Sequence, residues 1–85
     1  MNADPVHDVL QQTETVLTQT IEQQRQKVLR LARTLVNGAT TDDILNPHDF
    51  PALAADPQFN YEDGILAGLV SAQMAFRARV LREYV

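Results

Sequence analysis

The sequence predicts an all-α protein: an antiparallel helical hairpin with a structured connector, which pairs with a second copy into a homodimeric four-helix bundle. Three observations predict this fold class. Two long segments lack proline, apolar residues recur in the first of them with heptad spacing, and the 85 residues include no cysteine. A single domain this short buries only about 60% of its unfolded surface, and no disulfide can supplement its core. Self-association is the remaining common source of stability.

The first segment predicts a helix over about residues 5–37, because no Gly or Pro occurs in the 32 residues from 6 to 37. Asp4 is a suitable N-cap and Pro5 fits the first helical position. Gly38 provides a stop, since glycine readily adopts the left-handed conformation at the end of a helix. Such a helix is about 50 Å long, too long for a compact domain of this size.

Apolar residues of this helix alternate in steps of four and three, which is the pattern of a coiled-coil seam. The seam contains Leu10, Leu17, Ile21, Val28, Leu31 and Leu35. We expect packing between helices, or between copies, to involve residues of both long segments. These residues are Leu17, Ile21, Val28, Leu31, Leu35, Gly68, Ala72 and Phe76.

The last segment predicts a second helix over about residues 61–84, with Asn60 as its N-cap. A row of small residues runs along it at helical spacing and indicates that another helix approaches closely. The row consists of Gly64, Gly68, Ser71, Ala72, Ala75 and Ala78. Such rows also occur where helices associate in membranes, but this segment is short and ends in charged residues. Packing in water is therefore the preferred interpretation, and no membrane association is expected.

The connector, residues 38–60, predicts order rather than flexibility, with short helical turns at 41–45 and 49–55, the second capped by Asp49. A connection of 23 residues is unusual in a small domain unless it packs or has a function. Two roles stay open. The connector is a recognition surface for a protein partner, or its apolar residues close one end of the core. The residues assigned to partner binding are Asp42, Asp43, His48, Asp49 and Phe50, and those assigned to the core are Phe50, Leu53 and Phe59.

The sequence contains no motif for catalysis, so the protein is predicted not to be an enzyme and to need no cofactor or metal. The two histidines, His7 and His48, do not form any helical metal-binding spacing. Ser71, the only serine, has no histidine near it in the sequence, and no glycine-rich phosphate loop occurs.

Charge is distributed unevenly although the net charge is only −4. An acidic chain is a poor candidate for neutralising phosphates, so nucleic acid is not the expected partner. All seven basic residues lie in two clusters, which are Arg25, Lys27, Arg30 and Arg33, and Arg77, Arg79 and Arg82. We interpret each cluster as facing carboxylates on the other helix of the hairpin. The expected neighbours are Arg77 with Glu22, Arg82 with Glu14, and Arg33 with Glu62 and Asp63.

These observations favour a small, non-enzymatic, homodimeric interaction or adaptor protein that binds a protein partner. Two alternatives stay open: a nucleic-acid-associated regulator that uses the basic clusters, and a ligand-binding or enzymatic protein with a site at the subunit interface. The first eight residues lack the basic and apolar regions of a secretory signal. The expected location is therefore the cytoplasm.

Overall fold

The computed structural model describes residues 4–84, without the side chain of Tyr84. These residues form helices and no strand, which confirms the all-α prediction. In chain order the elements are α1 (Pro5–Leu35), α2 (Thr41–Leu45), the 3-10 helix η1 (Pro47–Asp49), α3 (Pro51–Ala54), α4 (Pro57–Phe76), the π-helical η2 (Arg77–Leu81) and α5 (Arg82–Tyr84).

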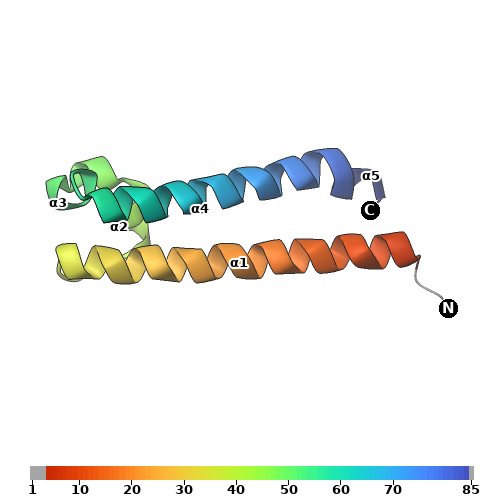
Figure 1. Ribbon diagram of the computed structural model, residues 1–85, viewed down its shortest axis with the longest axis horizontal. Coiled ribbons are helices and arrows are strands. Elements are labelled where there is room, and N and C mark those ends of the chain that lie inside the picture. The colour runs from red at the N-terminus through yellow and green to blue at the C-terminus, as the bar shows by residue number, and fades with distance from the viewer. Residues whose placement is uncertain (1–3, 85) are drawn as a thin grey trace.

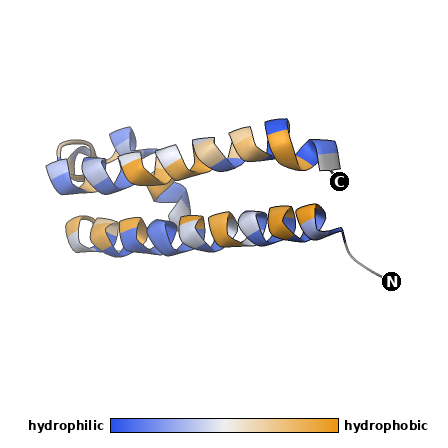
Figure 2. Ribbon diagram, turned by 45° about the vertical axis from the view of Figure 1, so that its right-hand side comes forward, coloured by the Kyte–Doolittle hydropathy of each residue, from blue (hydrophilic) through white to orange (hydrophobic). Residues whose placement is uncertain are grey.

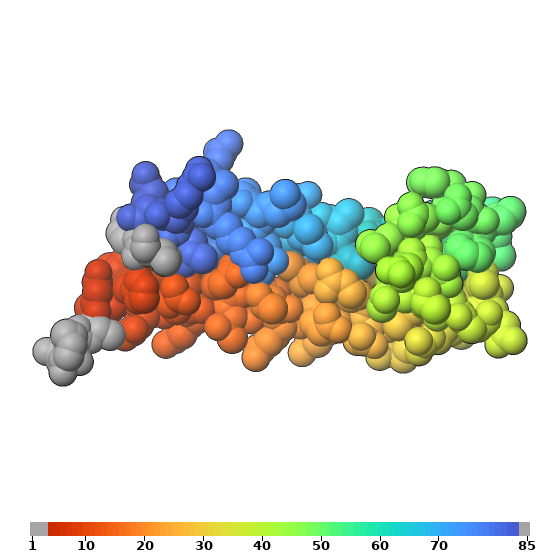
Figure 3. Space-filling view, turned by 180° about the vertical axis from the view of Figure 1, so that it is seen from behind, coloured from red at the N-terminus to blue at the C-terminus, as the bar shows by residue number. Residues whose placement is uncertain are grey.

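The two long helices, α1 and α4, lie side by side and run in opposite directions, with the short helices gathered at one end (Figure 1). The described ends of the chain lie together at the other end. The molecule is a rod of 53 × 20 × 18 Å, and its two rows of helical residues are visible from behind in Figure 3. Because the rod is only two helices wide, each long helix covers one side of the other and leaves the remaining sides open.

Helix α1 begins as the sequence predicts. The Asp4 carboxylate accepts a hydrogen bond from the backbone N–H of Val6 at 3.0 Å, and Pro5 occupies the first helical position. Gly38 has a φ of 74°, which confirms the predicted left-handed conformation. The helix ends at Leu35, two residues earlier than predicted.

Within the connector, α2 has the predicted bounds and is closed by a capping box. The Asp43 carboxylate accepts from the Thr40 N–H at 2.9 Å, and the Thr40 hydroxyl accepts from the Asp43 N–H at 3.3 Å. The predicted cap of the second short helix is wrong. Phe50 is the N-cap of α3 without a side-chain hydrogen bond, since Asp49 completes η1 and lies one residue too early to cap α3.

Helix α4 begins four residues earlier than the sequence predicts. The Asp56 carboxylate accepts from the Phe59 N–H at 2.8 Å and Pro57 follows as the first helical residue, so Asp56 is the N-cap. The prediction of Asn60 as N-cap is wrong. Asn60 lies inside the helix, where its side-chain amide donates to the Ala54 carbonyl at 3.0 Å.

The core lies at the connector end of the rod. Its most completely buried side chains are Val28 of α1, Leu53 of α3 and Phe59 of α4. The full set is Ile21, Val28, Leu29, Ala32, Ala39, Ile44, Leu53, Phe59 and Leu66. Leu53 and Phe59 therefore close the end of the core. Both long helices carry further apolar residues along the rest of the rod (Figure 2). These residues stay at least partly open to solvent.

Polar contacts join α1 to α4 and η2 beyond the core. The Gln73 amide donates to the Thr18 hydroxyl at 2.9 Å, and Arg77 Nε donates to Glu14 Oε2 at 2.7 Å. Gln73 is buried, and its contact with Thr18 satisfies one of its two amide donors. These contacts fix the register of the two helices over the half of the rod that lacks a buried apolar core.

This register differs from the one expected from the sequence. Arg77 pairs with Glu14 rather than Glu22, and Glu62 pairs with Lys27 rather than Arg33. The cause lies at the connector, where α1 ends two residues earlier and α4 begins four residues earlier than predicted. As a result, the chain turns back at residues of lower number in both helices than predicted. Each residue of α4 therefore lies opposite an earlier residue of α1.

Candidate functional site

A groove of about 470 Å³ opens between α2 and the side of the α1–α4 pair, and we call it the connector groove. Buried Ile44 and Leu66 form apolar parts of its wall, whereas Leu45 is 71% exposed. The lining residues are Arg25, Thr41, Asp42, Ile44, Leu45, Pro47, Asp63, Leu66, Ala67 and Val70. The groove therefore combines three segments that are distant in the sequence.

Local structure explains why the groove exists. The capping box holds α2 as a single rigid turn, and Ile44 packs into the core. Successive residues on a helix point about 100° apart, and on the single turn of α2 Ile44 faces the core while Leu45 projects outward. Leu45 therefore adds an exposed apolar side chain to the rim of the groove, beside the apolar wall that Ile44 and Leu66 form.

The charges of the groove are not balanced within it. Arg25 Nη1 lies 3.1 Å from Glu22 Oε1, so this cation is already paired. None of the ion pairs within residues 4–84 involves Asp42 or Asp63. Burial raises the pKa of Asp63 because water solvates its carboxylate less well there. An apolar ligand segment that also carries a positive charge matches this combination.

The residues predicted to bind a partner are not all brought together. Asp42 lines the groove, whereas Asp43 is used in the capping box of α2. His48 and Asp49 are exposed on η1 and do not line the groove. Phe50 is half-buried against the core. Within residues 4–84 no three acidic or histidine side chains come close enough to hold a metal ion.

The sequence prediction missed Arg25, Leu45 and Asp63 as groove residues. Leu45 gave only a weak signal, because the Ile44-Leu45 pair shows that α2 carries two apolar residues but not which of them faces the core. Arg25 and Asp63 gave no such signal, since their proximity depends on the register between α1 and α4.

A second open surface lies on the other side of the α1–α4 pair. The Gln24 amide donates to Glu62 Oε1 at 2.8 Å, and Lys27 Nζ lies 3.3 Å from Glu62 Oε2. These contacts join one flank of α1 to one flank of α4. Arg25 and Asp63 lie on the opposite flank of each helix. Residues seven apart share a flank, so each flank can be followed along its helix from Gln24 and Glu62.

We call the resulting surface the apolar face. Steps of seven from Gln24 lead to leucines, and steps of seven from Glu62 lead to Leu69 and Phe76. The neighbouring stripe of each helix, further from the other helix, includes some of the most exposed apolar side chains of the protein, such as Val9 at 59% and Tyr61 at 68%. Its members are Val6, Val9, Leu10, Thr13, Val16, Leu17, Thr20, Gln24, Leu31 and Leu35 of α1, and Tyr61, Ile65, Leu69, Ala72 and Phe76 of α4.

The residues predicted to pack between helices divide into three groups. Ile21 and Val28 are buried in the core. Leu17, Leu31, Leu35 and Phe76 are half-buried on the apolar face. Gly68 and Ala72 are exposed, and a methyl group at Gly68 would have no side chain or other helix within 4 Å. Within one chain, the row of small residues therefore does not pack against α1.

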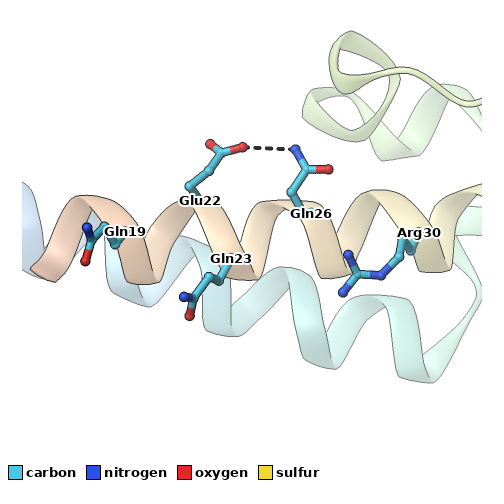
Figure 4. A pocket seen from close by; sticks show the side chains of 5 residues that line it. All are labelled: Gln19, Glu22, Gln23, Gln26 and Arg30. Carbon is cyan, nitrogen blue, oxygen red and sulfur yellow. Dashed lines mark hydrogen bonds between the residues drawn. The ribbon is translucent and has the colours of Figure 1, made fainter.

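The outer side of α1 is polar. Figure 4 shows a shallow depression there, lined by Gln19, Glu22, Gln23, Gln26 and Arg30, with the Gln26 amide donating to Glu22 Oε2 at 2.9 Å. All five side chains come from one helix, so this depression lacks a second wall. The basic clusters are also partly neutralised, because Arg25, Lys27 and Arg77 all form ion pairs.

Helix α4 is unusually apolar for a helix so little covered. Together with η2, from Pro57 to Leu81, it is long and apolar enough to cross a membrane by length and composition, and only 6% of its most apolar window is buried. A core helix of a water-soluble protein is mostly buried, whereas this window of α4 is mostly exposed. No protein-family model, curated protein or solved structure matches the chain.

Proposed function

We propose that this chain is a small, non-enzymatic, homodimeric adaptor, built as an antiparallel helical hairpin whose second copy completes a four-helix bundle. The observation that supports it is the presence of two open apolar surfaces on opposite sides of the α1–α4 pair. One is the long apolar face and the other is the short connector groove. A homodimeric adaptor needs one surface that binds its second copy and another surface that binds its protein partner.

The connector groove suits a segment of a protein partner that has a large apolar side chain and a neighbouring Lys or Arg. Leu45 and Leu66 offer contact to the apolar side chain, and Asp42 and Asp63 offer charge to the basic one. The capped α2 turn orders the groove in advance, so binding loses less conformational entropy. A charged pair at the rim favours correct orientation more than affinity.

Two variants test the partner site. Leu45→Asp places a charge at the groove, whereas Met74→Asp places the same charge at a comparably exposed apolar residue outside it. A partner isolated with the wild-type protein from its native cell should bind Leu45→Asp at least about tenfold more weakly by calorimetry, since an apolar anchor contributes about 1–2 kcal/mol or more. It should bind Met74→Asp unchanged. Equal binding to all three proteins would contradict a site in the groove.

A further inference from the structure

The apolar face and the connector groove differ in what can cover them. We infer that a second copy of this chain covers the apolar face, leaving the connector groove of each copy open; this inference rests on the proposed homodimer and names its interface. Charge distinguishes the two surfaces. The face has no charged residue from Val6 to Thr20 on α1, and α4 has none from Ile65 to Phe76.

A two-fold dimer places the same patch of both copies in contact, so the patch must tolerate itself. The apolar face meets this condition because its members are uncharged and the ion pair beside them, Lys27 with Glu62, has no net charge. The connector groove does not meet it. Two copies joined through the groove would bring the unpaired carboxylates of Asp42 and Asp63 toward their own equivalents, and like charges across an interface are unfavourable.

The side-chain donors of Thr13, Thr20 and Gln24 on the apolar face already have acceptors. The Thr13 hydroxyl donates to the Val9 carbonyl at 2.8 Å, and the Thr20 hydroxyl donates to the Val16 carbonyl at 2.8 Å. The Gln24 amide is held by Glu62. Covering these groups with another helix therefore leaves none of these donors unpaired, which removes the main cost of burying polar side chains.

The size of the face also suits a stable dimer. It follows α1 for about 45 Å and α4 for about 24 Å, and each helix provides about half of the 20 Å width of the rod. Each copy therefore offers about 700 Å², and the two together about 1,400 Å², within the range of about 1,200–2,000 Å² for stable interfaces. Two α1–α4 pairs stacked in this way form four helices around one core, the usual arrangement of a four-helix bundle.

The experiment uses the full chain and three substitutions at exposed apolar residues, so that each copy keeps its own core. Val16 and Ile65 lie on the apolar face, on α1 and α4, and are 58% and 37% exposed. Met74 is 63% exposed on the opposite side and serves as the matched control. Each residue is replaced by Glu, and circular dichroism checks that the helical content is unchanged. Sedimentation equilibrium measures the dimer dissociation constant. Binding of each protein to vesicles of phosphatidylcholine and phosphatidylglycerol is measured separately.

We expect the wild type and Met74→Glu to be dimers of about twice the 9.5 kDa chain mass at micromolar concentration. Val16→Glu and Ile65→Glu should raise the dissociation constant at least about 100-fold, because each dimer would bury two unpaired carboxylates. A dimer that resists both face variants, or that only Met74→Glu dissociates, overturns the interface and leaves the proposed homodimer standing. A wild-type monomer overturns the homodimer as well, and vesicle binding by that monomer would identify a lipid surface as the occupant.

Discussion

Glu62 of α4 contacts α1 through both a hydrogen bond and an ion pair. It is only 7% exposed, and it accepts from the Gln24 amide while pairing with Lys27. These contacts lower the pKa of Glu62, the hydrogen bond from Gln24 having the larger effect. The sequence alone gave no reason to select Glu62 over Asp63, because the difference arises from which flank of α4 faces α1.

The lowered pKa of Glu62 predicts how stability depends on pH. The folded protein binds a proton on Glu62 less readily than the unfolded chain, so this contribution is present above the ordinary value of 4.5 and is lost as pH falls through the folded pKa. Melting temperatures measured from about pH 6 to pH 3 should therefore fall less steeply for Glu62→Gln than for the wild type.

Asp63 provides the opposite control. Burial raises its pKa, so protonation on acidification stabilises the folded state and partly offsets the loss at Glu62. Removing this group in Asp63→Asn should make the acid-side fall in melting temperature steeper than in the wild type. Identical pH profiles for the two variants would contradict the assigned environments of both carboxylates.

Leu53 shows how the connector contributes to stability. Its side chain is fully buried although it belongs to a helix of four residues. Leu53→Ala should lower the free energy of unfolding by about 2–5 kcal/mol, the usual cost of removing a buried leucine side chain. Leu45→Ala, at a residue 71% exposed in the same connector, should cost less than about 0.5 kcal/mol. Chemical denaturation of both variants measures the difference.

At the scale of elements, capping chemistry made the start of α1 and the whole of α2 predictable. The start of α4 was not, because Asp56-Pro57 and Asn60 both fit a helix N-terminus and the sequence offers no means of ranking them. Tertiary packing resolves the choice. Starting at Pro57 places Phe59 inside the core, where it is fully buried, and burial of an aromatic side chain outweighs the difference between two caps.

The two candidate caps can be compared directly. Asp56→Ala removes the acceptor for the Phe59 N–H and should cost about 0.5–2 kcal/mol, as is typical of N-cap removal. Asn60→Ala removes one exposed side-chain hydrogen bond and should cost less. Thermal or chemical denaturation gives both values. A larger loss for Asn60→Ala would place the start of α4 at the residue that the sequence first suggested.

At the scale of the whole molecule, the heptad seam predicted the long first helix and that it packs, but not how the seam is divided between neighbours. Ile21 and Val28 face α4 inside one chain, while Leu10, Leu17 and Leu31 lie beside them on the open apolar face. A repeat of seven follows one stripe, and in an α-helix that stripe is wide enough to contact two neighbours. Spacing therefore indicates that a residue packs, and only the register shows against which helix.

The glycines offer a last test of which side of α4 is covered in the assembled protein. Gly64 and Gly68 lie on the outer side of α4, where an added methyl group would have no side chain or other helix within 4 Å. If the second copy covers the apolar face, that outer side stays open. Alanine at Gly68 should then stabilise the helix by about 1 kcal/mol and raise the melting temperature by about 4–8 °C. Gly38→Ala should lower it, because the φ of 74° at Gly38 strains any residue with a Cβ. A lower melting temperature for Gly68→Ala would instead indicate that a helix of another chain packs closely against the row of small residues.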